Sequence, residues 1–275
     1  MGQSADEADK PFIPSVERVR SAQVILHIGP PKTATTHIQY TIRRLHEDLL
    51  KAGYCYPSNS QKDLHSIGIS LREGDMPGKI LRDKVFGCLK SGKKLIFSTE
   101  KLSQTETEEG FRRIFDFFSG YHVHVIAAFR DPLSLSYSWY NQVLRDNRNV
   151  ATFTEHLSHE FDQYRLRALS SALFNFQKLY GRENMTVIDF HGMLAAQKDP
   201  SYVFLCEILG VLCDAKYVAS EGSHPSADLR PSYLFAFVRN VVSSLGCDFL
   251  APRKAFDELT EAYEELDFTI AELLE

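Results

Sequence analysis

Four apolar runs, separated by helical patterns, are the feature that most constrains the fold of this chain. They are QVILHI (23–28), KKLIFS (93–98), YHVHVIAAF (121–129) and MTVIDF (185–190). Apolar runs of this length are typical of strands buried on both faces, as in a parallel sheet. Strands that alternate with helices are joined by right-handed crossovers. We therefore expect an α/β fold of three layers, α/β/α, around a central, mostly parallel sheet.

Apolar residues spaced by three and four predict the helices between those runs. One stripe covers 38–49, directly after the first run, and two more cover 111–118 and 166–180. After residue 200 only helical patterns and loops follow, so the C-terminal part is expected to be helical. The stretch 57–92 is rich in Gly, Ser, Lys and Asp. It is expected to form an excursion beside the site.

Length and composition predict one domain behind a short lead-in. The chain has 275 residues, of which 44% are hydrophobic and 24% charged, as in ordinary globular proteins. No internal repeat and no low-complexity linker interrupts it. We expect residues 1–20 to be a flexible lead-in and residues 21–275 to form a single domain.

The net charge of −5 hides an asymmetry between the C-terminal tail and the rest. Residues 257–275 contain eight acids and no Lys or Arg, so the remainder is mildly basic. This balance suits a small anionic ligand and argues against nucleic acid. The tail, about 253–275, predicts an acidic amphipathic helix that packs on the body. A homodimer formed through this helix is the alternative.

Neither a membrane span nor a metal site is predicted. No apolar stretch approaches the roughly 20 residues that a transmembrane helix needs, and the N-terminus lacks the apolar run of a secretory signal. The five cysteines are scattered and form no CxxC pair. We expect reduced thiols, no structural zinc and a cytoplasmic location.

The turn after the first run has the composition of a phosphate-binding turn. It reads GPPKTATT (29–36) and leads into the predicted helix. Ligands of open α/β sheets bind at the carboxyl ends of strands, and a helix that begins there offers free N–H groups and a positive dipole end. The two prolines donate no hydrogen bond. The amides after them, the charge of Lys32 and the threonine hydroxyls are the expected donors.

This turn is not the nucleotide-triphosphate loop GxxxxGK[ST]. Lys32 follows Gly29 by only three positions, and Thr35 stands where that loop has its lysine. No lysine therefore precedes the last threonine to reach a γ-phosphate. This argues against an ATP or GTP hydrolase.

The same stretch resembles the phosphosulfate loop, commonly PKxGTT, of sulfotransferases that use 3′-phosphoadenosine-5′-phosphosulfate (PAPS). The resemblance implies a P-loop NTPase-like sulfotransferase fold and PAPS as co-substrate, with no metal required. It implies that Lys32 stabilises charge on the departing adenosine 3′,5′-bisphosphate. Ala34 stands where that family usually has Gly, and it fits only if the backbone there is near-helical. The residues that would hold the 5′ end are Pro31, Lys32, Thr33, Ala34, Thr35 and Thr36.

A second anchor is predicted in VIAAFRDPLSLSYSWYNQVLR (125–145). Asp131 can cap a helix and Pro132 suits its first position, which leaves Arg130 at the carboxyl end of a strand. Sulfotransferases hold the 3′-phosphate with an Arg at a strand end and a Ser eight residues later, and Arg130 and Ser138 match that pattern. A guanidinium can donate two parallel hydrogen bonds to phosphate.

Sulfuryl transfer to a hydroxyl also needs a base near the acceptor. Two candidates stay open, both suggested by the regions where sulfotransferases place such a group. His65 lies in the excursion after the first helix, and Glu100 follows the second apolar run and would act as the base or orient the acceptor. By contrast, His27 is expected to be a core histidine, and His122 and His124 are expected to carry no chemistry.

Segments 95–103, 161–193 and 223–240 also resemble bacterial-type sulfotransferases that act on carbohydrate or other small hydroxyl acceptors. The glycine-rich RKGxxG segment of cytosolic steroid and phenol sulfotransferases is absent, and the segment around Arg230 is a candidate to cover the adenosine. We consider two other functions. One is a small-molecule kinase with an unusual loop, and the other is a non-catalytic nucleotide-binding or assembly protein whose acidic tail recruits partners.

Overall fold

The computed structural model describes most of the chain up to residue 214 and four isolated residues after it. The described residues are 16–57, 61–75, 77–146, 152–162 and 165–214, together with Phe235, Val238, Lys254 and Glu258. They belong to two compact units, which are described separately. The first comprises residues 1–130 and 168–222, and the second comprises 131–167 and 223–275. The expectation of a single domain over 21–275 stays a prediction.

Helices and strands alternate along the described chain, as the sequence predicts. The elements are α1 (Val16–Ser21), β1 (Val24–Gly29), α2 (Thr35–Arg44), α3 (His46–Lys51), β2 (Tyr54–Cys55), α4 (Gln61–Glu73), α5 (Lys79–Lys90), β3 (Lys94–Ser98), the 3-10 turn η2 (Glu100–Gln104), α6 (Glu108–Phe117), β4 (Val123–Phe129), α7 (Pro132–Asp146), α8 (Phe153–Asp162), α9 (Arg165–Tyr180), the 3-10 turn η3 (Arg182–Asn184), β5 (Met185–Asp189), α10 (Phe190–Ala195), α11 (Pro200–Tyr202) and the π-helical segment η4 (Val203–Ile208). The structure departs from the predicted boundaries in two places. The helix expected over 38–49 is divided at Leu45 into α2 and α3, and α1 occupies the end of the expected lead-in.

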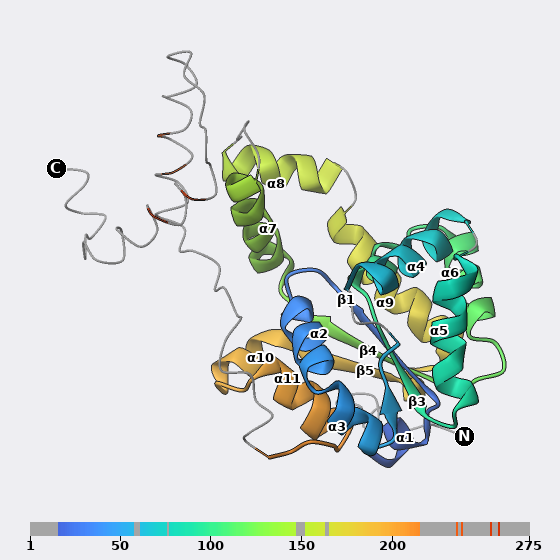
Figure 1. Ribbon diagram of the computed structural model, residues 1–275. Coiled ribbons are helices and arrows are strands. Elements are labelled where there is room, and N and C mark those ends of the chain that lie inside the picture. Colours follow the sequence, from blue (N-terminus) through green and yellow to red (C-terminus); the bar gives the residue numbers. More distant parts are fainter. Residues whose placement is uncertain are drawn as a thin grey trace, which may run out of the picture. The chain divides into compact units, whose positions relative to one another are not determined.

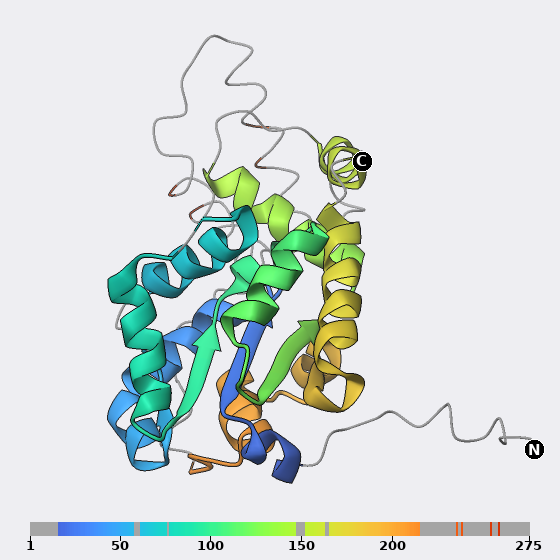
Figure 2. The ribbon, with the colours of Figure 1, turned by 90° about the vertical axis from the view of Figure 1, so that its right-hand side faces the viewer.

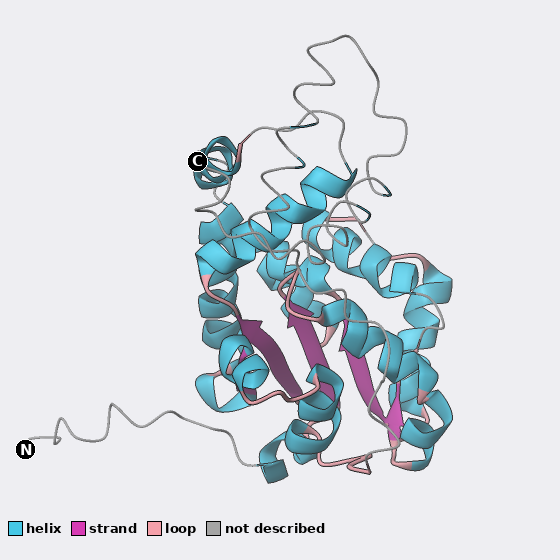
Figure 3. Ribbon diagram, turned by 90° about the vertical axis from the view of Figure 1, so that its left-hand side faces the viewer, coloured by secondary structure: helices cyan, strands magenta, loops and turns pink. Residues whose placement is uncertain are grey.

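The first unit contains a five-stranded sheet in the order β2-β3-β1-β4-β5, in which every pair of neighbours is parallel (Figure 1). Because all strands run the same way, their carboxyl ends lie at one edge of the sheet (Figure 3). Val24 of β1 pairs with Leu95 of β3 on one side and with Val123 of β4 on the other. The central position of β1 explains why all six of its residues are buried. The expected α/β fold around a parallel sheet is confirmed.

Helices cover both faces of this sheet. α2 and α11 lie on one face, while α5, α6 and α9 lie on the other (Figures 1 and 2). On the first face, Ser201 Oγ donates to Thr41 Oγ1 at 2.9 Å. On the second, the rings of Phe111 in α6 and Phe176 in α9 meet edge to face at 5.4 Å. The apolar stripes predicted from the sequence thus face the sheet, and the core fills both interlayer spaces.

The second unit contains α7 and α8 among its described elements. Asp131 begins this unit and accepts a hydrogen bond from the Ser134 amide at 2.9 Å, which satisfies one of the unpaired N–H groups in the first turn of α7. Pro132 is the first residue of α7, where its missing N–H costs nothing. The rings of Tyr137 and Tyr140 pack on Phe153 at 5.5 and 5.4 Å and join the two helices.

The cysteines depart from the expectation of reduced thiols. Disulfides link Cys55 to Cys88 and Cys206 to Cys213. The expectation is therefore wrong for these four residues, because the fold brings together cysteines that are 33 and 7 positions apart in sequence. Spacing alone could not reveal the first pair, which ties β2 to α5. A cytoplasmic location stays a prediction.

The C-terminal predictions fall almost entirely outside the described residues. These are the acidic helix of about 253–275, its dimer and the segment around Arg230. Lys254 and Glu258 are described, and they form an exposed ion pair one helical turn apart. Among the helices of the described residues, none is long and apolar enough to cross a membrane.

Candidate active site

Three turns that carry predicted site residues follow three neighbouring strands of the first unit. The turn with Lys32 follows β1, Glu100 follows β3, and Arg130 follows β4. The order β3-β1-β4 puts these strands side by side, with β1 in the middle. Along the chain, the connections from β1 go first to one side of the sheet and later to the other. Ligands of parallel α/β sheets bind at such a switch point, outside the carboxyl ends of the strands.

The turn after β1 contains two non-glycine residues with left-handed backbone. Lys32 has φ +65° and Ala34 has φ +59°, and Gly29 before them has φ +85°. Ala34 therefore lacks the near-helical backbone that would accommodate it without strain. It lies immediately before α2 with φ 59° and ψ 20°, a conformation that a Cβ disfavours. The glycine usual at this position of the sulfotransferase loop would remove that cost.

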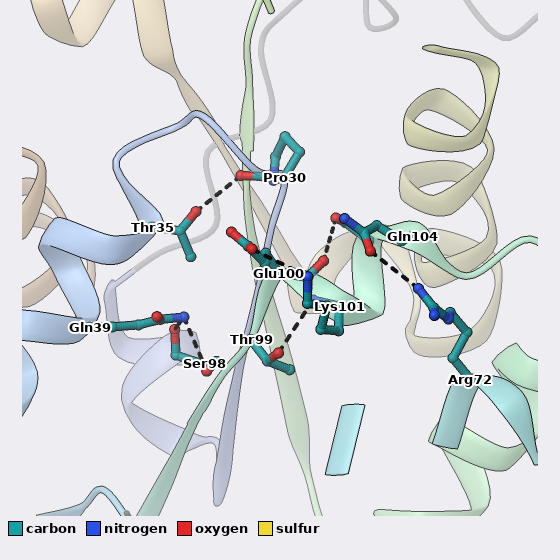
Figure 4. Close-up of polar contacts among 10 residues, drawn as sticks. Pro30, Thr35, Gln39, Arg72, Ser98, Thr99, Glu100, Lys101 and Gln104 are labelled. Carbon is teal, nitrogen blue, oxygen red and sulfur yellow. Dashed lines mark hydrogen bonds and ion pairs between the residues drawn. The ribbon is translucent and has the colours of Figure 1, made fainter. Parts of the chain in front are cut away.

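Threonine hydroxyls close the turn from within. Thr33 Oγ1 and Thr35 Oγ1 both donate to the carbonyl oxygen of Pro30, at 2.7 and 3.0 Å, and both residues are buried. Figure 4 shows the Thr35 contact. These hydroxyl hydrogens are therefore used inside the turn, and the prediction that they point at a ligand is not supported here. Thr36 is exposed, while Pro31 is buried. The backbone amides remain the main donors of the turn.

The start of α2 is the electropositive part of this turn. Ala34 makes no side-chain cap, and the first helical hydrogen bond runs from the Ile38 amide to the Ala34 carbonyl at 3.0 Å. The amides of Thr35, Thr36 and His37 precede that bond, so no acceptor within the helix is available to them. A helix start without a side-chain cap favours an anion through both its N–H groups and its dipole.

Arg130 points toward the turn after β1. Its Nη1 donates to the Lys32 carbonyl oxygen at 2.5 Å, and its guanidinium lies over the Phe190 ring, 5.0 Å from the centroid. Sequence spacing indicated a strand-end arginine. It gave no sign of Phe190, which follows β5 and reaches Arg130 only through the fold.

Glu100 lies beside the start of the same turn. A Cβ placed on Gly29 would stand 3.1 Å from both Cα and Cβ of Glu100, so only glycine leaves room for the two turns to meet this closely. The Glu100 carboxylate forms an ion pair with Lys101 at 3.6 Å, and Thr99 Oγ1 accepts from the Lys101 amide at 3.3 Å (Figure 4). A carboxylate is thus placed next to a turn that offers N–H donors and a lysine.

His65 lies in α4, which packs against the Glu100 turn. A Cβ on Gly68, one turn further along α4, would meet Thr99 and Lys101 side chains at 3.0 and 3.1 Å. Burial lowers the pKa of His65 below its ordinary value; the Glu100 charge opposes this, while Lys101 and Arg43 reinforce it. Its Nε2 is buried without a hydrogen-bond partner among the described residues. The structure therefore brings His65 and Glu100, the two candidate bases, into one neighbourhood.

Ser138 belongs to α7 of the second unit, where its side chain is buried. Asp131 caps that helix as predicted, with Ser138 seven positions later. The pairing of Ser138 with Arg130 stays a prediction from spacing.

Buried polar residues below the turns were not all found from the sequence. His27 Nδ1 and Ser98 Oγ lie 2.7 Å apart, and Gln39 Nε2 donates to the same hydroxyl at 3.2 Å. His27 is fully buried, as expected of a core histidine, although its Nε2 has no hydrogen-bond partner among the described residues, and burial lowers its pKa to about 4. His37, in the first turn of α2, contacts Asp199 at 2.8 Å. Only the tertiary fold reveals these pairs, because their partners lie 59 to 162 positions apart.

His124 lies in β4 and His122 directly precedes that strand, and the expectation that neither carries chemistry stays a prediction. His124 is buried and contacts Thr186 Oγ1 at 2.8 Å, and burial lowers its pKa to about 4. His122 is exposed and contacts Asn184 at the opposite end of the strand from Arg130.

Comparison with known proteins gives one structural likeness. No family model and no curated protein matches the sequence. A solved structure described as a crystal structure of a sulfotransferase from Alicyclobacillus acidocaldarius is similar, with a TM-score of 0.49 and 16% sequence identity. The similarity covers 84% of this chain and 98% of that chain. The case for a function therefore rests on the residues at the carboxyl ends of β1, β3 and β4.

Proposed function

We propose that this protein is a sulfotransferase that moves the sulfuryl group of PAPS to a hydroxyl acceptor. The observation that carries the proposal is the convergence of Lys32, Glu100 and Arg130 from the ends of three adjacent parallel strands. In the first unit the Lys32 turn is the middle one, with the Arg130 guanidinium on the side of β4 and the Glu100 carboxylate on the side of β3. The resemblance of GPPKTATT to the phosphosulfate loop supports PAPS as the ligand.

We assign residues to each of the two ends of such a nucleotide. The amides at the start of α2 and the Lys32 ammonium would hold the phosphosulfate, and Arg130 with Ser138 would hold the 3′-phosphate. Hydrogen bonds to charged groups contribute roughly 1.5–3 kcal/mol each. Micromolar binding corresponds to about 8 kcal/mol. Several such bonds are needed to reach this value, and we propose that the two anchors supply them together.

The transfer itself is an in-line displacement at sulfur. The acceptor oxygen forms a new bond to sulfur as the bond from sulfur to the bridging phosphate oxygen breaks, which releases adenosine 3′,5′-bisphosphate. The acceptor proton passes to His65 or Glu100. Lys32 stabilises the negative charge that develops on the bridging oxygen. Positioning and charge stabilisation account for most catalysis in such transfers. We propose a carbohydrate or another small hydroxyl compound as the acceptor.

A ligand-binding experiment tests the nucleotide assignment directly. A ligand that binds the native state raises the melting temperature. Adenosine 3′,5′-bisphosphate should therefore raise it, whereas ATP with Mg²⁺ should not. The reverse result would favour the small-molecule kinase. Transfer of label from PAPS to a panel of hydroxyl acceptors then tests activity, and nucleotide binding without transfer to any acceptor would favour the non-catalytic alternative.

A further inference from the structure

Arg130 makes two contacts that a residue serving only the 3′-phosphate does not need. Its Nη1 donates to the Lys32 carbonyl oxygen at 2.5 Å, and its guanidinium lies over the ring of Phe190. Lys32 itself belongs to the turn that would hold the other end of the nucleotide. Arg130 therefore contacts the backbone of the 5′ anchor while it stands at the predicted 3′ anchor.

The contact falls on a backbone position that needs support. Lys32 has φ +65° and Ala34 has φ +59°, conformations that side chains disfavour. Within a planar trans peptide the C=O and the following N–H point to opposite sides. Fixing the Lys32 carbonyl toward Arg130 thus directs the Thr33 amide away from it. Successive amides arranged in this way form an anion-binding concavity.

The turn is therefore fixed from two sides. Thr33 and Thr35 hydroxyls hold the Pro30 carbonyl from within, and Arg130 holds the Lys32 carbonyl from β4. A charged donor forms a stronger hydrogen bond to a carbonyl than a neutral one does. The Arg130 contact is consequently well suited to stabilise the left-handed residue.

Phe190 fixes the plane of the guanidinium. It is buried, and it is the first residue of α10 after β5. Asp189 accepts a hydrogen bond from the Gly192 amide at 3.0 Å and so fixes the start of that helix. A cation over an aromatic face is attracted by the ring quadrupole. An arginine held on this ring keeps the direction of its N–H groups.

We propose that Arg130, supported by Phe190 as a positioning residue, organises the phosphate-binding turn after β1 and so couples the two anchors of the nucleotide. The inference rests on the proposed function for the identity of the ligand. It goes beyond a contact to the 3′-phosphate, because it makes Arg130 important for ligands that have no 3′-phosphate.

Titration calorimetry with adenosine 3′,5′-bisphosphate and with AMP tests this coupling. Arg130→Met should weaken binding of both, and the loss for AMP should be roughly tenfold, as expected for one charged hydrogen bond. Phe190→Leu should weaken AMP binding to a smaller extent. Phe190→Tyr, which keeps the aromatic ring, should bind AMP as the wild type does. In the Arg130→Met background, Phe190→Leu should cause no further loss of AMP affinity. Unchanged AMP affinity in Arg130→Met, with bisphosphate binding lost, would overturn the inference.

A second measurement separates this inference from the proposed function. Amide hydrogen exchange at residues 32–36, measured without nucleotide, should be faster in Arg130→Met and Phe190→Leu than in the wild type. Phe176→Leu, which truncates a fully buried ring of α9, is the control and should leave exchange in the turn unchanged. Unchanged exchange in Arg130→Met would overturn the inference, whereas a wild type that binds neither nucleotide would overturn the proposed function.

Discussion

The turns after β1 and β3 lie side by side but offer opposite chemistry. The β1 turn has left-handed backbone at Lys32 and Ala34, and it leads into a helix without a side-chain cap. The β3 turn leads instead to Glu100, with Thr99 as an ordinary cap. The first is suited to hold an anion and the second to accept a proton or orient a hydroxyl. Under the proposed function, neighbouring strands of one sheet would divide nucleotide binding and acceptor activation between them.

The two turns also differ in how they are supported. The β1 turn is held by hydrogen bonds to its own backbone carbonyls, from the Thr33 and Thr35 hydroxyls and from Arg130. Side chains surround the β3 turn, with Lys101 paired to Glu100 and His65 nearby on α4. The geometry of the first turn therefore depends on hydrogen bonds, whereas the chemistry of the second depends on charge.

The largest expected effect concerns the base. Replacing it should lower kcat by roughly 10²- to 10⁴-fold, and we expect this of His65→Gln. Because burial lowers the pKa of His65, the neutral form persists at pH 7. Activity should fall as the pH drops through a value below 6.5, which a pH profile of kcat/KM would show, and His65→Gln should abolish this acid limb.

Glu100→Gln and the exposed Glu106→Gln complete the test of the base. If Glu100→Gln causes the larger loss and His65→Gln keeps the acid limb, the base belongs to the β3 turn itself. Glu106→Gln should leave kcat unchanged.

Lys32→Ala should produce the next largest effect. Loss of one group that stabilises charge in the transition state typically lowers kcat by about 10²- to 10³-fold. The melting temperature should change little, because Lys32 keeps its backbone contact to Arg130. Steady-state kinetics and thermal unfolding measure the two quantities. Lys51→Ala, an exposed lysine of α3, is the matched control, and normal turnover in a folded Lys32→Ala protein would remove the leaving-group role.

The histidine beneath both turns should affect acid stability. His27 in β1 contacts Ser98 at the end of β3, and burial lowers its pKa to about 4. The unfolded chain binds this proton near pH 6.5, so the free energy of unfolding should fall as the pH decreases from 6.5 to 4. The contribution is about 3 kcal/mol. Urea unfolding at several pH values measures this. The free energy of unfolding should depend less on pH in His27→Gln than in the wild type, and equally in the exposed His122→Gln.

Ala34→Gly should produce the smallest effect, with a stabilising sign. Relief of the left-handed backbone should raise the free energy of unfolding by about 1–2 kcal/mol. The added freedom of glycine in the unfolded chain offsets about 0.4–1 kcal/mol of this gain. The melting temperature should rise by about 2–4 °C per kcal/mol gained. Ala52→Gly, where φ is −77°, should not stabilise. A lower melting temperature in Ala34→Gly would contradict this account of the turn.

The sequence predicted the sheet well and the arrangement around it less well. Apolar runs gave β1, β3, β4 and β5. The interior strands β1, β3 and β4 are buried on both faces and so contain few polar residues, whereas β5 is an edge strand with exposed positions. β2 is only two residues long and has no such signature. Asp131 and Pro132 correctly located the start of α7, since capping depends on neighbouring residues alone. The tertiary fold brought Cys55 to Cys88, which are 33 positions apart, and so decided a pairing that local patterns do not encode.

The same division holds for the candidate site. Local composition marked Lys32 and Arg130 as strand-end residues, because turns and helix starts are short-range features. Three facts depended on the fold: the left-handed backbone at Ala34, the contact of Arg130 with the Lys32 carbonyl, and the support from Phe190. Sequence alone determined that a parallel sheet would present turns with Lys32 and Arg130 at one edge, since hydrophobic periodicity and turn chemistry are local properties of the sequence. Tertiary structure decided which of those groups meet, because contacts between distant segments depend on how the strands are ordered in the sheet.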